Sequence, residues 1–319
     1  MKLVRTGDQL AGSYFYEKIR TRINLRGNVD KDGNLTLEEF DQAGKQTGLF
    51  KGIWTVAAAG DGRIHLAGNW SKPPGEKGSE KKTAFSLYEQ PIYLTGDVEI
   101  VSKEINETNK KLMYEIGAQY PQITGGSNPN FEKFNQAARA SVTRKVAGFK
   151  KDMQPAEGTE EEPPPEGSTG STLSVGYIVE LAQDDLVSIK FTIGNYFAGA
   201  AHPNTYADVL NFDLKNGKQL KLGDLFKPGS KFLQVIAAYC IADLKKQKDR
   251  GLVVEEIEKG AAASSDNYSS WTITRRGLAV YFDSYQVGPY AAGPQTVLVP
   301  YSALKDLINP DGPIAQFAK

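Results

Sequence analysis

The stretch YPQITGGSNPNFEKFNQAARASVTRKVAGF, residues 120–149, contains the change from strand to helix that decides the fold class. Its first residues, Tyr120 to Ile123, have an extended character and lead into two glycines. Asn128 and Pro129 then stand where a helix N-cap and a first-turn proline belong. Apolar side chains follow at three- and four-residue steps, at Phe131, Phe134, Ala138, Val142, Val146 and Phe149. The stretch therefore predicts a strand followed by an amphipathic helix.

The residues before this stretch alternate with the period of a half-buried strand. Gly-containing turns, such as Asp32-Gly33-Asn34, separate the alternating runs. The apolar pairs that sit two positions apart are Tyr14 and Tyr16, Ile23 and Leu25, Leu35 and Leu37, Ile64 and Leu66, and Phe85 and Leu87. This pattern predicts an antiparallel meander or small β-barrel over residues 1–90.

Strand and helix patterns both return in the second half of the chain. Asn216-Gly217 marks a tight hairpin. The other expected elements are strands at 175–179, 187–191, 271–273, 278–282 and 296–301, with a turn at 275–277, a helix at 230–248, and a short helix capped by Ser302. Because strands and helices are clustered and do not alternate strictly, the predicted class is α+β, with the N-terminal β unit followed by a mixed antiparallel sheet and helices.

The length of 319 residues favours two or three domains. We expect a β-rich domain at 1–90, an α+β module at 91–200 and a second α+β module at 201–319. Residues 155–171 are rich in Pro and Glu and contain no apolar residue larger than Ala. Such a segment cannot bury enough surface to become ordered, so it is predicted to be a mobile acidic loop.

Composition excludes several classes of function. Lys and Arg total 38 and Asp and Glu total 38, so no net charge attracts the chain to nucleic acid. One cysteine and two histidines argue against an internal disulfide, a zinc site and an iron–sulfur cluster, and no metal or other cofactor is predicted. Cys240 lies on the apolar stripe of the helix predicted at 230–248 and is best explained as a small core residue.

The sequence excludes neither a cytosolic nor an extracytoplasmic location. No run reaches the roughly 18 apolar residues of a membrane span, and Met1 to Gly12 has a basic start without an apolar run after it. The chain is therefore expected either to work in the cytosol or to be a mature form whose leader was replaced. Its oligomeric state is left open.

The strongest apparent catalytic or metal motif is Asp30 to Asp41, which looks like a calcium-binding EF-hand loop. However, Leu35 stands where that loop needs Gly, and Asp41 stands where it needs a bidentate Glu. The flanking residues alternate as strands, so a hairpin turn is the preferred interpretation. No nucleophile elbow, phosphate-binding loop or dinucleotide fingerprint is present, and no catalytic residue is predicted.

Two loops, 199–205 and 285–294, combine Gly and Pro with residues typical of recognition surfaces. Two alternatives are open: the tyrosines pack on the sheet and the histidine satisfies a backbone group, or the loops form a binding face. The candidate binding residues are His202, Pro203, Asn204, Tyr285, Pro289 and Tyr290.

An ordered set of motifs over residues 91–319 resembles a tandem pair of bacterial envelope domains. The motifs are Tyr120 to Ile123 with Gly125, Gly199 to Asn204, Asn211 to Leu214 with Asn216 to Lys218, Asp224 to Phe226, and Tyr285 to Gly293. They resemble the module that precedes peptidoglycan deacetylase domains, followed by the C-terminal domain of the lysozyme-sensing anti-sigma factor RsiV. The resemblance implies a periplasmic or extracellular protein. The metal-binding deacetylase domain, the membrane helix and the sigma-binding segment of these families are not present in the sequence.

The resemblance implies a non-enzymatic cell-envelope protein that binds a lysozyme-like muramidase or a peptidoglycan-related glycan through loops 199–205 and 285–294. The alternative is a hydrolase or carbohydrate-active enzyme with a site near His202 and a carboxylate such as Asp208 or Asp283. Absence of lysozyme binding and inhibition at micromolar protein, together with buried tyrosines at 285 and 290, would contradict the lysozyme hypothesis. A carboxylate within hydrogen-bond reach of His202 would favour the second.

Overall fold

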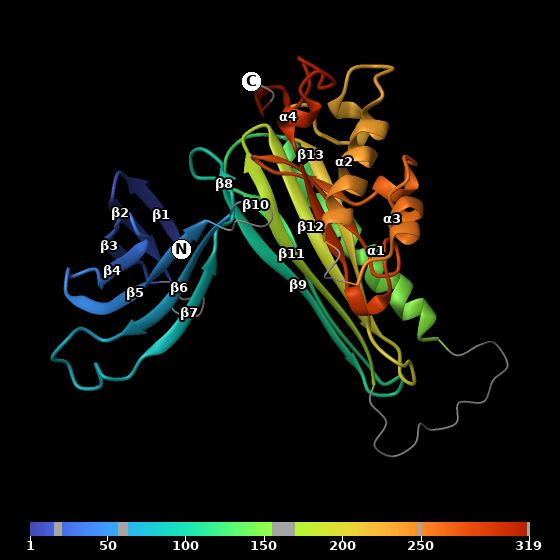
Figure 1. Ribbon diagram of the computed structural model, residues 1–319. Helices are drawn as coiled ribbons and strands as arrows, with labels where there is room; N and C mark the ends of the chain where they lie inside the picture. Colours follow the sequence, from blue (N-terminus) through green and yellow to red (C-terminus); the bar gives the residue numbers. More distant parts are fainter. Residues whose placement is uncertain (16–20, 57–62, 155–169, 248–250, 318–319) are drawn as a thin grey trace. The chain divides into compact units, whose positions relative to one another are not determined.

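The computed structural model describes residues 1–15, 21–56, 63–154, 170–247 and 251–317. The chain divides into two compact units, Met1–Glu89 and Gln90–Lys319, which are described separately (Figure 1). The acidic loop predicted over 155–171 lies outside the described residues except for its last two. Within the described chain, none of the helices is both long enough and apolar enough to span a bilayer.

The first unit is a seven-stranded antiparallel sheet whose strands follow the order of the sequence. The strands are β1 (Lys2–Thr6), β2 (Gln9–Tyr14), β3 (Ile23–Val29), β4 (Asn34–Phe40), β5 (Gln46–Val56), β6 (Ile64–Ser71) and β7 (Thr83–Tyr88). Alternate residues such as Leu25, Leu37 and Leu66 are buried on one face. The predicted meander is confirmed and forms a half-barrel.

The segment that looks like a calcium-binding loop is the hairpin turn between β3 and β4. The Asp30 carboxylate accepts hydrogen bonds from the amides of Asp32 (2.9 Å) and Asn34 (2.8 Å), and Gly33 has a positive φ of 84°. The Asn34 side chain also donates a hydrogen bond to the Asp30 carboxylate, and this bond has the largest influence on the pKa of that carboxyl group. Together these hydrogen bonds lower the pKa of Asp30. The hairpin interpretation is confirmed, because strands and not helices flank the turn.

No strand is predicted from the sequence over β5, and the packing around the buried Glu39 carboxylate explains why. Glu39 accepts hydrogen bonds from the Tyr14 hydroxyl (2.7 Å), the Thr47 hydroxyl (2.7 Å) and the Trp70 indole nitrogen (3.0 Å). A Cβ at Gly48 would lie 2.3 Å from that indole nitrogen, so only glycine fits. The glycine interrupts the apolar alternation that would otherwise reveal the strand.

The second unit is built on a large mixed sheet with the order β14-β13-β12-β11-β10-β9, and β8 beside β11. Its strands are β8 (Ile92–Tyr93), β9 (Glu99–Asn109), β10 (Tyr114–Thr124), β11 (Ser171–Gln183), β12 (Leu186–Tyr196), β13 (Asn204–Asp213) and β14 (Lys218–Gln219). β10 and β11 are parallel, and α1 (Asn130–Asp152) follows β10 in the chain before β11. The helix begins one residue later than predicted, because Pro129 and not Asn128 is its N-cap and no side chain caps it. The Asn128 side chain accepts a hydrogen bond from the Asn130 amide at 2.9 Å just before the helix.

The two faces of the large sheet belong to different cores. Val187 of β12 packs with α1, whereas its neighbour Leu186 packs with the C-terminal elements, as expected when successive side chains point to opposite faces. Those elements are α2 (Phe232–Lys246), α3 (Val254–Gly260), a three-stranded sheet of β15 (Trp271–Ile273), β16 (Gly277–Phe282) and β17 (Gln295–Pro300), and α4 (Tyr301–Leu304). This arrangement confirms the α+β class (Figure 1).

Two details of the C-terminal elements bear on the sequence predictions. Cys240 is buried in the core, and burial raises the pKa of its thiol to about 12, as expected for a packing residue. The expected cap of the last helix is wrong, because α4 begins at Tyr301 after Pro300 and Ser302 lies inside it.

The expected boundary between modules near residue 200 falls within a continuous sheet. β12 and β13 lie on either side of that boundary and pair antiparallel from Leu186 opposite Asp213 to Asn195 opposite Asn204. The division into 91–200 and 201–319 stays a prediction.

Candidate functional site

The structure brings the two predicted loops together. The first loop closes the hairpin between β12 and β13, and the second follows β16. The rings of His202 and Tyr290 stack with their centroids 3.9 Å apart and an interplanar angle of 24°. The Tyr285 ring lies 5.6 Å from the Tyr290 ring. We call these three residues the aromatic cluster.

Hydrogen bonds hold the aromatic cluster at its edges. The Tyr290 hydroxyl donates to the Pro203 carbonyl oxygen at 2.7 Å. The same oxygen lies 3.0 Å from His202 Nδ1, and the Tyr285 hydroxyl lies 3.4 Å from His202 Nε2. Because a carbonyl oxygen only accepts, Nδ1 carries the proton in this contact and Nε2 of the neutral ring is left to accept from Tyr285.

The cluster is open to solvent. Tyr285 is 64% exposed, His202 is exposed, and Tyr290 is half-buried. Pro203, Asn204 and Pro289 are exposed at its margin. The alternative in which Tyr285 packs into the sheet is therefore contradicted, whereas the binding role of all six residues stays a prediction.

Tyr285 is presented in a strained conformation. Its φ is 70°, in the left-handed region that non-glycine residues rarely adopt. The turn around it is closed by hydrogen bonds from the Gln286 amide to the Asp283 carbonyl (3.0 Å) and from the Asp283 amide to Gln286 Oε1 (3.2 Å). Gln286 Nε2 also donates to the carbonyls of Gly260 (3.0 Å) and Asn267 (3.1 Å). The hydrogen bonds of Gln286 on the core side of the loop therefore hold the exposed Tyr285 in place.

The two carboxylates considered as partners of His202 are engaged elsewhere. Asp283 accepts a hydrogen bond from the Ala207 amide at 2.9 Å, and burial raises its pKa. Asp208 forms an ion pair with Lys145 of α1 at 3.0 Å. Within the described chain, the ring nitrogens of His202 contact Pro203 and Tyr285 and no carboxylate. The geometry supports presentation of aromatic surface more than acid–base chemistry.

Sequence reasoning missed the structural roles of the residues that support the cluster. Pro289, which was expected only as a contact residue, directly precedes the short helix η4 (Tyr290–Ala292) that contains Tyr290. Asp283 and Gln286 brace the loop through backbone groups of Ala207, Gly260 and Asn267. No spacing in the sequence signals such contacts, because the backbone partners can be any residue type.

Two protein-family models match parts of the chain. Residues 107–205 match the family described as Deacetylase PdaC, and residues 223–302 match a Protein of unknown function (DUF3298). The expected resemblance to a deacetylase-associated module followed by an envelope domain of this second kind is confirmed. The resemblance to the anti-sigma factor itself stays a prediction.

The curated relatives are longer than the part that matches. The Bacillus subtilis peptidoglycan-N-acetylmuramic acid deacetylase PdaC is 27% identical over 214 residues, which cover 67% of this chain and 42% of that protein. The Mycobacterium tuberculosis immunogenic protein MPT64 is 28% identical over 111 residues, covering 35% of this chain and 47% of that one. The chain thus spans less than half the length of either relative.

Two solved structures of the DUF3298 family are similar to the chain. The one from Bacteroides fragilis has a TM-score of 0.48 and 18% identity, covering 70% of this chain and 98% of that one. The one from Pseudomonas aeruginosa has a TM-score of 0.44 and 16% identity, covering 67% of this chain and 94% of that one.

Proposed function

We propose that this chain is a cell-envelope protein that binds a peptidoglycan-related glycan through the aromatic cluster of His202, Tyr285 and Tyr290. One observation carries the proposal: two loops that lie 83 residues apart in sequence converge on an exposed, stacked aromatic surface. An aromatic ring offers a rigid apolar face with a polar tip, which suits a ligand whose ring faces are apolar and whose edges carry hydroxyls.

The similarity to known protein families supports a role in the cell envelope. His202 lies within the region that matches the PdaC family, and both tyrosines lie within the region that matches DUF3298. The B. subtilis relative is named for deacetylating N-acetylmuramic acid of peptidoglycan. An extracytoplasmic location and contact with the cell wall follow from this likeness as part of the proposal.

The proposed role is recognition, not hydrolysis. The described neighbours of His202 are a carbonyl oxygen and a phenol, so the cluster provides no carboxylate to orient a general base. The strained backbone at Tyr285 fits a residue that is held in place before its ligand arrives, which lowers the entropic cost of binding.

A lysozyme-like muramidase is the second candidate ligand. The observation that favours it is the 64% exposure of Tyr285, since rigid, projecting tyrosines commonly anchor protein interfaces. The formal net charge of zero gives no long-range attraction for a cationic enzyme, so such binding would depend on local contacts.

The proposal is tested by sedimentation of the chain with purified insoluble peptidoglycan. We expect the wild-type chain to sediment and Tyr285→Ala and Tyr290→Ala to weaken binding roughly tenfold or more. Tyr88→Ala is the matched control, because Tyr88 is equally exposed and stacks on a histidine, but belongs to the first unit. Equal binding by Tyr285→Ala and the wild type would contradict the proposal.

The same variants separate the second candidate. A pull-down with hen-type lysozyme and an inhibition assay of its muramidase activity are carried out at micromolar protein concentration. Binding and inhibition that need Tyr285, without sedimentation on peptidoglycan, would replace the glycan by a muramidase as the ligand. Sedimentation without inhibition would support the glycan.

A further inference from the structure

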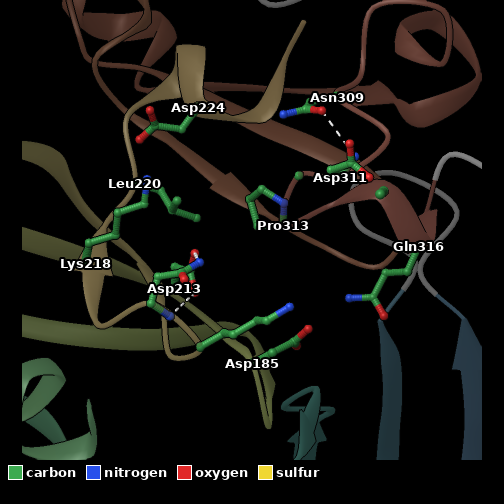
Figure 2. Close-up of a pocket in the computed structure, with 13 residues that line it drawn as sticks. Asp185, Asp213, Lys218, Leu220, Asp224, Asn309, Asp311, Pro313 and Gln316 are labelled. Atoms are coloured by element: carbon green, nitrogen blue, oxygen red, sulfur yellow. Dashed lines mark hydrogen bonds between the residues drawn. The ribbon is translucent and has the colours of Figure 1, made fainter.

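A polar cavity of about 400 Å³ is present in the second unit (Figure 2). It lies at the opposite end of β12 and β13 from the aromatic cluster. Its walls come from three places in the chain: the turn between β11 and β12 at Asp185, the turn 213–218 that joins β13 to β14, and the C-terminal loop 309–316. Asp224 of the short helix η1 (Leu222–Leu225) completes the wall. The volume falls within the range of small-molecule sites.

Hydrogen bonds fix each wall before any ligand is present. The Leu214 amide donates to the Asp185 carbonyl at 2.9 Å, which joins the first two turns. Asn130 at the start of α1 donates its side-chain amide to the carbonyls of Leu214 (3.0 Å) and Lys215 (3.3 Å). The Asn309 amide donates to the Leu225 carbonyl at 3.0 Å. Hydrogen bonds therefore hold the walls in place. The cavity is open to solvent, because the side chains of Asp185, Lys215, Lys218 and Asp311 are exposed.

The charged side chains of the lining fall into two groups. Asp213 accepts from the amide and the side chain of Asn216 (2.8 and 2.7 Å), and Asp224 accepts from the Lys221 amide (2.9 Å), so these two carboxylates have structural partners. The other charged lining residues are Asp185, Asp311, Lys215 and Lys218. In the part of the chain that the structure describes, these four side chains form no hydrogen bond or ion pair with one another.

We propose that this cavity binds a zwitterionic ligand, an amino acid or short peptide with a free ammonium and a free carboxylate group. The carboxylates of Asp185 and Asp311 suit the ammonium, and the ammonium groups of Lys215 and Lys218 suit the carboxylate. Figure 2 shows Lys218 and Asp311 on opposite sides of the cavity, so the two ends of one ligand can be held separately.

Other ligand classes fit the lining less well. An inorganic anion would meet more carboxylates than lysines, and a simple cation would meet both lysines. No aromatic side chain is among the lining residues of the described cavity, and Leu220 and Pro313 supply its main apolar contacts, so a sugar would lack a stacking surface. A ligand carrying both charges pairs with both sets of groups.

The test is isothermal titration of the full chain with the dipeptide alanylalanine. We expect saturable binding, and we expect Lys218→Gln and Asp311→Asn each to weaken it roughly fivefold or more. Lys305→Gln is the matched control, because Lys305 is exposed and outside the lining. Alanylalanine acetylated at its amino end and amidated at its carboxyl end should not bind.

The proposal would be overturned by the absence of heat at about 10 mM dipeptide, where even a weak complex forms. It would also be overturned by equal binding of the blocked dipeptide, or by unchanged affinity in both cavity variants. Binding of N-acetylglucosamine in place of the dipeptide would also overturn it. Tyr285→Ala is expected to retain dipeptide binding, so failure of this proposal and failure of the aromatic cluster as a binding site are distinguishable.

Discussion

Tyr285 combines high exposure with a backbone conformation that costs free energy. Its positive φ of 70° is unfavourable for any residue with a Cβ, but not for glycine. Tyr285→Gly should therefore be more stable to unfolding than Tyr285→Ala by about 1 kcal/mol, while both lose ligand binding. Urea denaturation of the two variants measures the difference.

Tyr290 supplies the matched control, because it stands in the same loop without a positive φ. There, glycine should be less stable than alanine, since it adds only freedom to the unfolded chain. If glycine were not favoured at position 285, the strain argument for a preorganised tyrosine would fail.

The residue types of the site could be predicted, but their support could not. His202, Tyr285 and Tyr290 were found because Gly- and Pro-containing loops with aromatic residues are typical of binding surfaces. Asp283 and Gln286 act on backbone groups far away in sequence, so their residue types carry no signal. The cavity was missed for the same reason, because its walls meet only when three separate turns come together.

At the scale of elements, α1 is tied to the edge strand β9 by one ion pair. Lys150 Nζ lies 2.8 Å from Glu107 Oε2, and the Tyr114 hydroxyl donates to Glu107 Oε1 at 2.6 Å. The hydrogen bond from Lys150, followed by that from Tyr114, lowers the pKa of Glu107, and the Glu107 contact raises the pKa of Lys150. The pair is partly exposed, so solvent screening keeps its effect modest.

The pH dependence of this tie has a definite sign. A lowered carboxyl pKa means that the folded state favours the ionised Glu107, so its contribution is complete above the ordinary value of 4.5 and is lost as pH falls through the lower folded value. Lys150 contributes below its ordinary value of 10.5 and loses this contribution as pH rises through the raised folded value. The ion pair therefore makes its full contribution to stability between pH 4.5 and pH 10.5.

Glu107→Gln should therefore reduce the loss of stability on acidification. Thermal unfolding followed by circular dichroism from about pH 3 to pH 7 should show a smaller change in Tm for the variant than for the wild type. Glu115→Gln on the neighbouring strand β10 is the control, because the Glu115 side chain is exposed, and it should behave like the wild type. Parallel curves for Glu107→Gln and the wild type would contradict the role of the pair.

Elements with strong local signals could be predicted, and those shaped by neighbours could not. The turn at Asp30–Asn34, the helix α1 and the helix α2 followed from turn residues and apolar periodicity. The seven-residue helix α3 buries only Ile257 and Gly260, so it has no apolar stripe to reveal it. The parallel pairing of β10 with β11 depends on where α1 returns the chain, which periodicity does not determine.

At the scale of the whole molecule, the chain offers one natural place to divide it. Met1–Glu89 and Gln90–Lys319 are each compact, with separate cores. We propose that each is an independent domain, and we expect fragments 1–89 and 90–319 to fold alone and to unfold cooperatively in urea. Whether the chain has three domains then depends on whether a domain boundary exists near residue 200.

A division at residue 200 should abolish folding of both halves. It would separate β12 from β13, which pair along their full length. It would also break a buried chain of hydrogen bonds between the two sheets: Ser188 donates to Asn211 Oδ1 at 2.5 Å, and its oxygen accepts from the Ile273 amide at 2.9 Å. Each group left buried without its partner costs about 1–3 kcal/mol, a large part of the stability of a domain.

Fragments 90–200 and 201–319 test this expectation directly. Each should give circular dichroism and amide NMR spectra of an unfolded or aggregated chain, while an equimolar mixture should recover the spectrum of 90–319 if the halves still find each other. Fragment 90–319 made as one chain is the control. Well-dispersed spectra from either half alone would show that 91–200 and 201–319 are domains in their own right, and that the sheet across residue 200 is an interface between them.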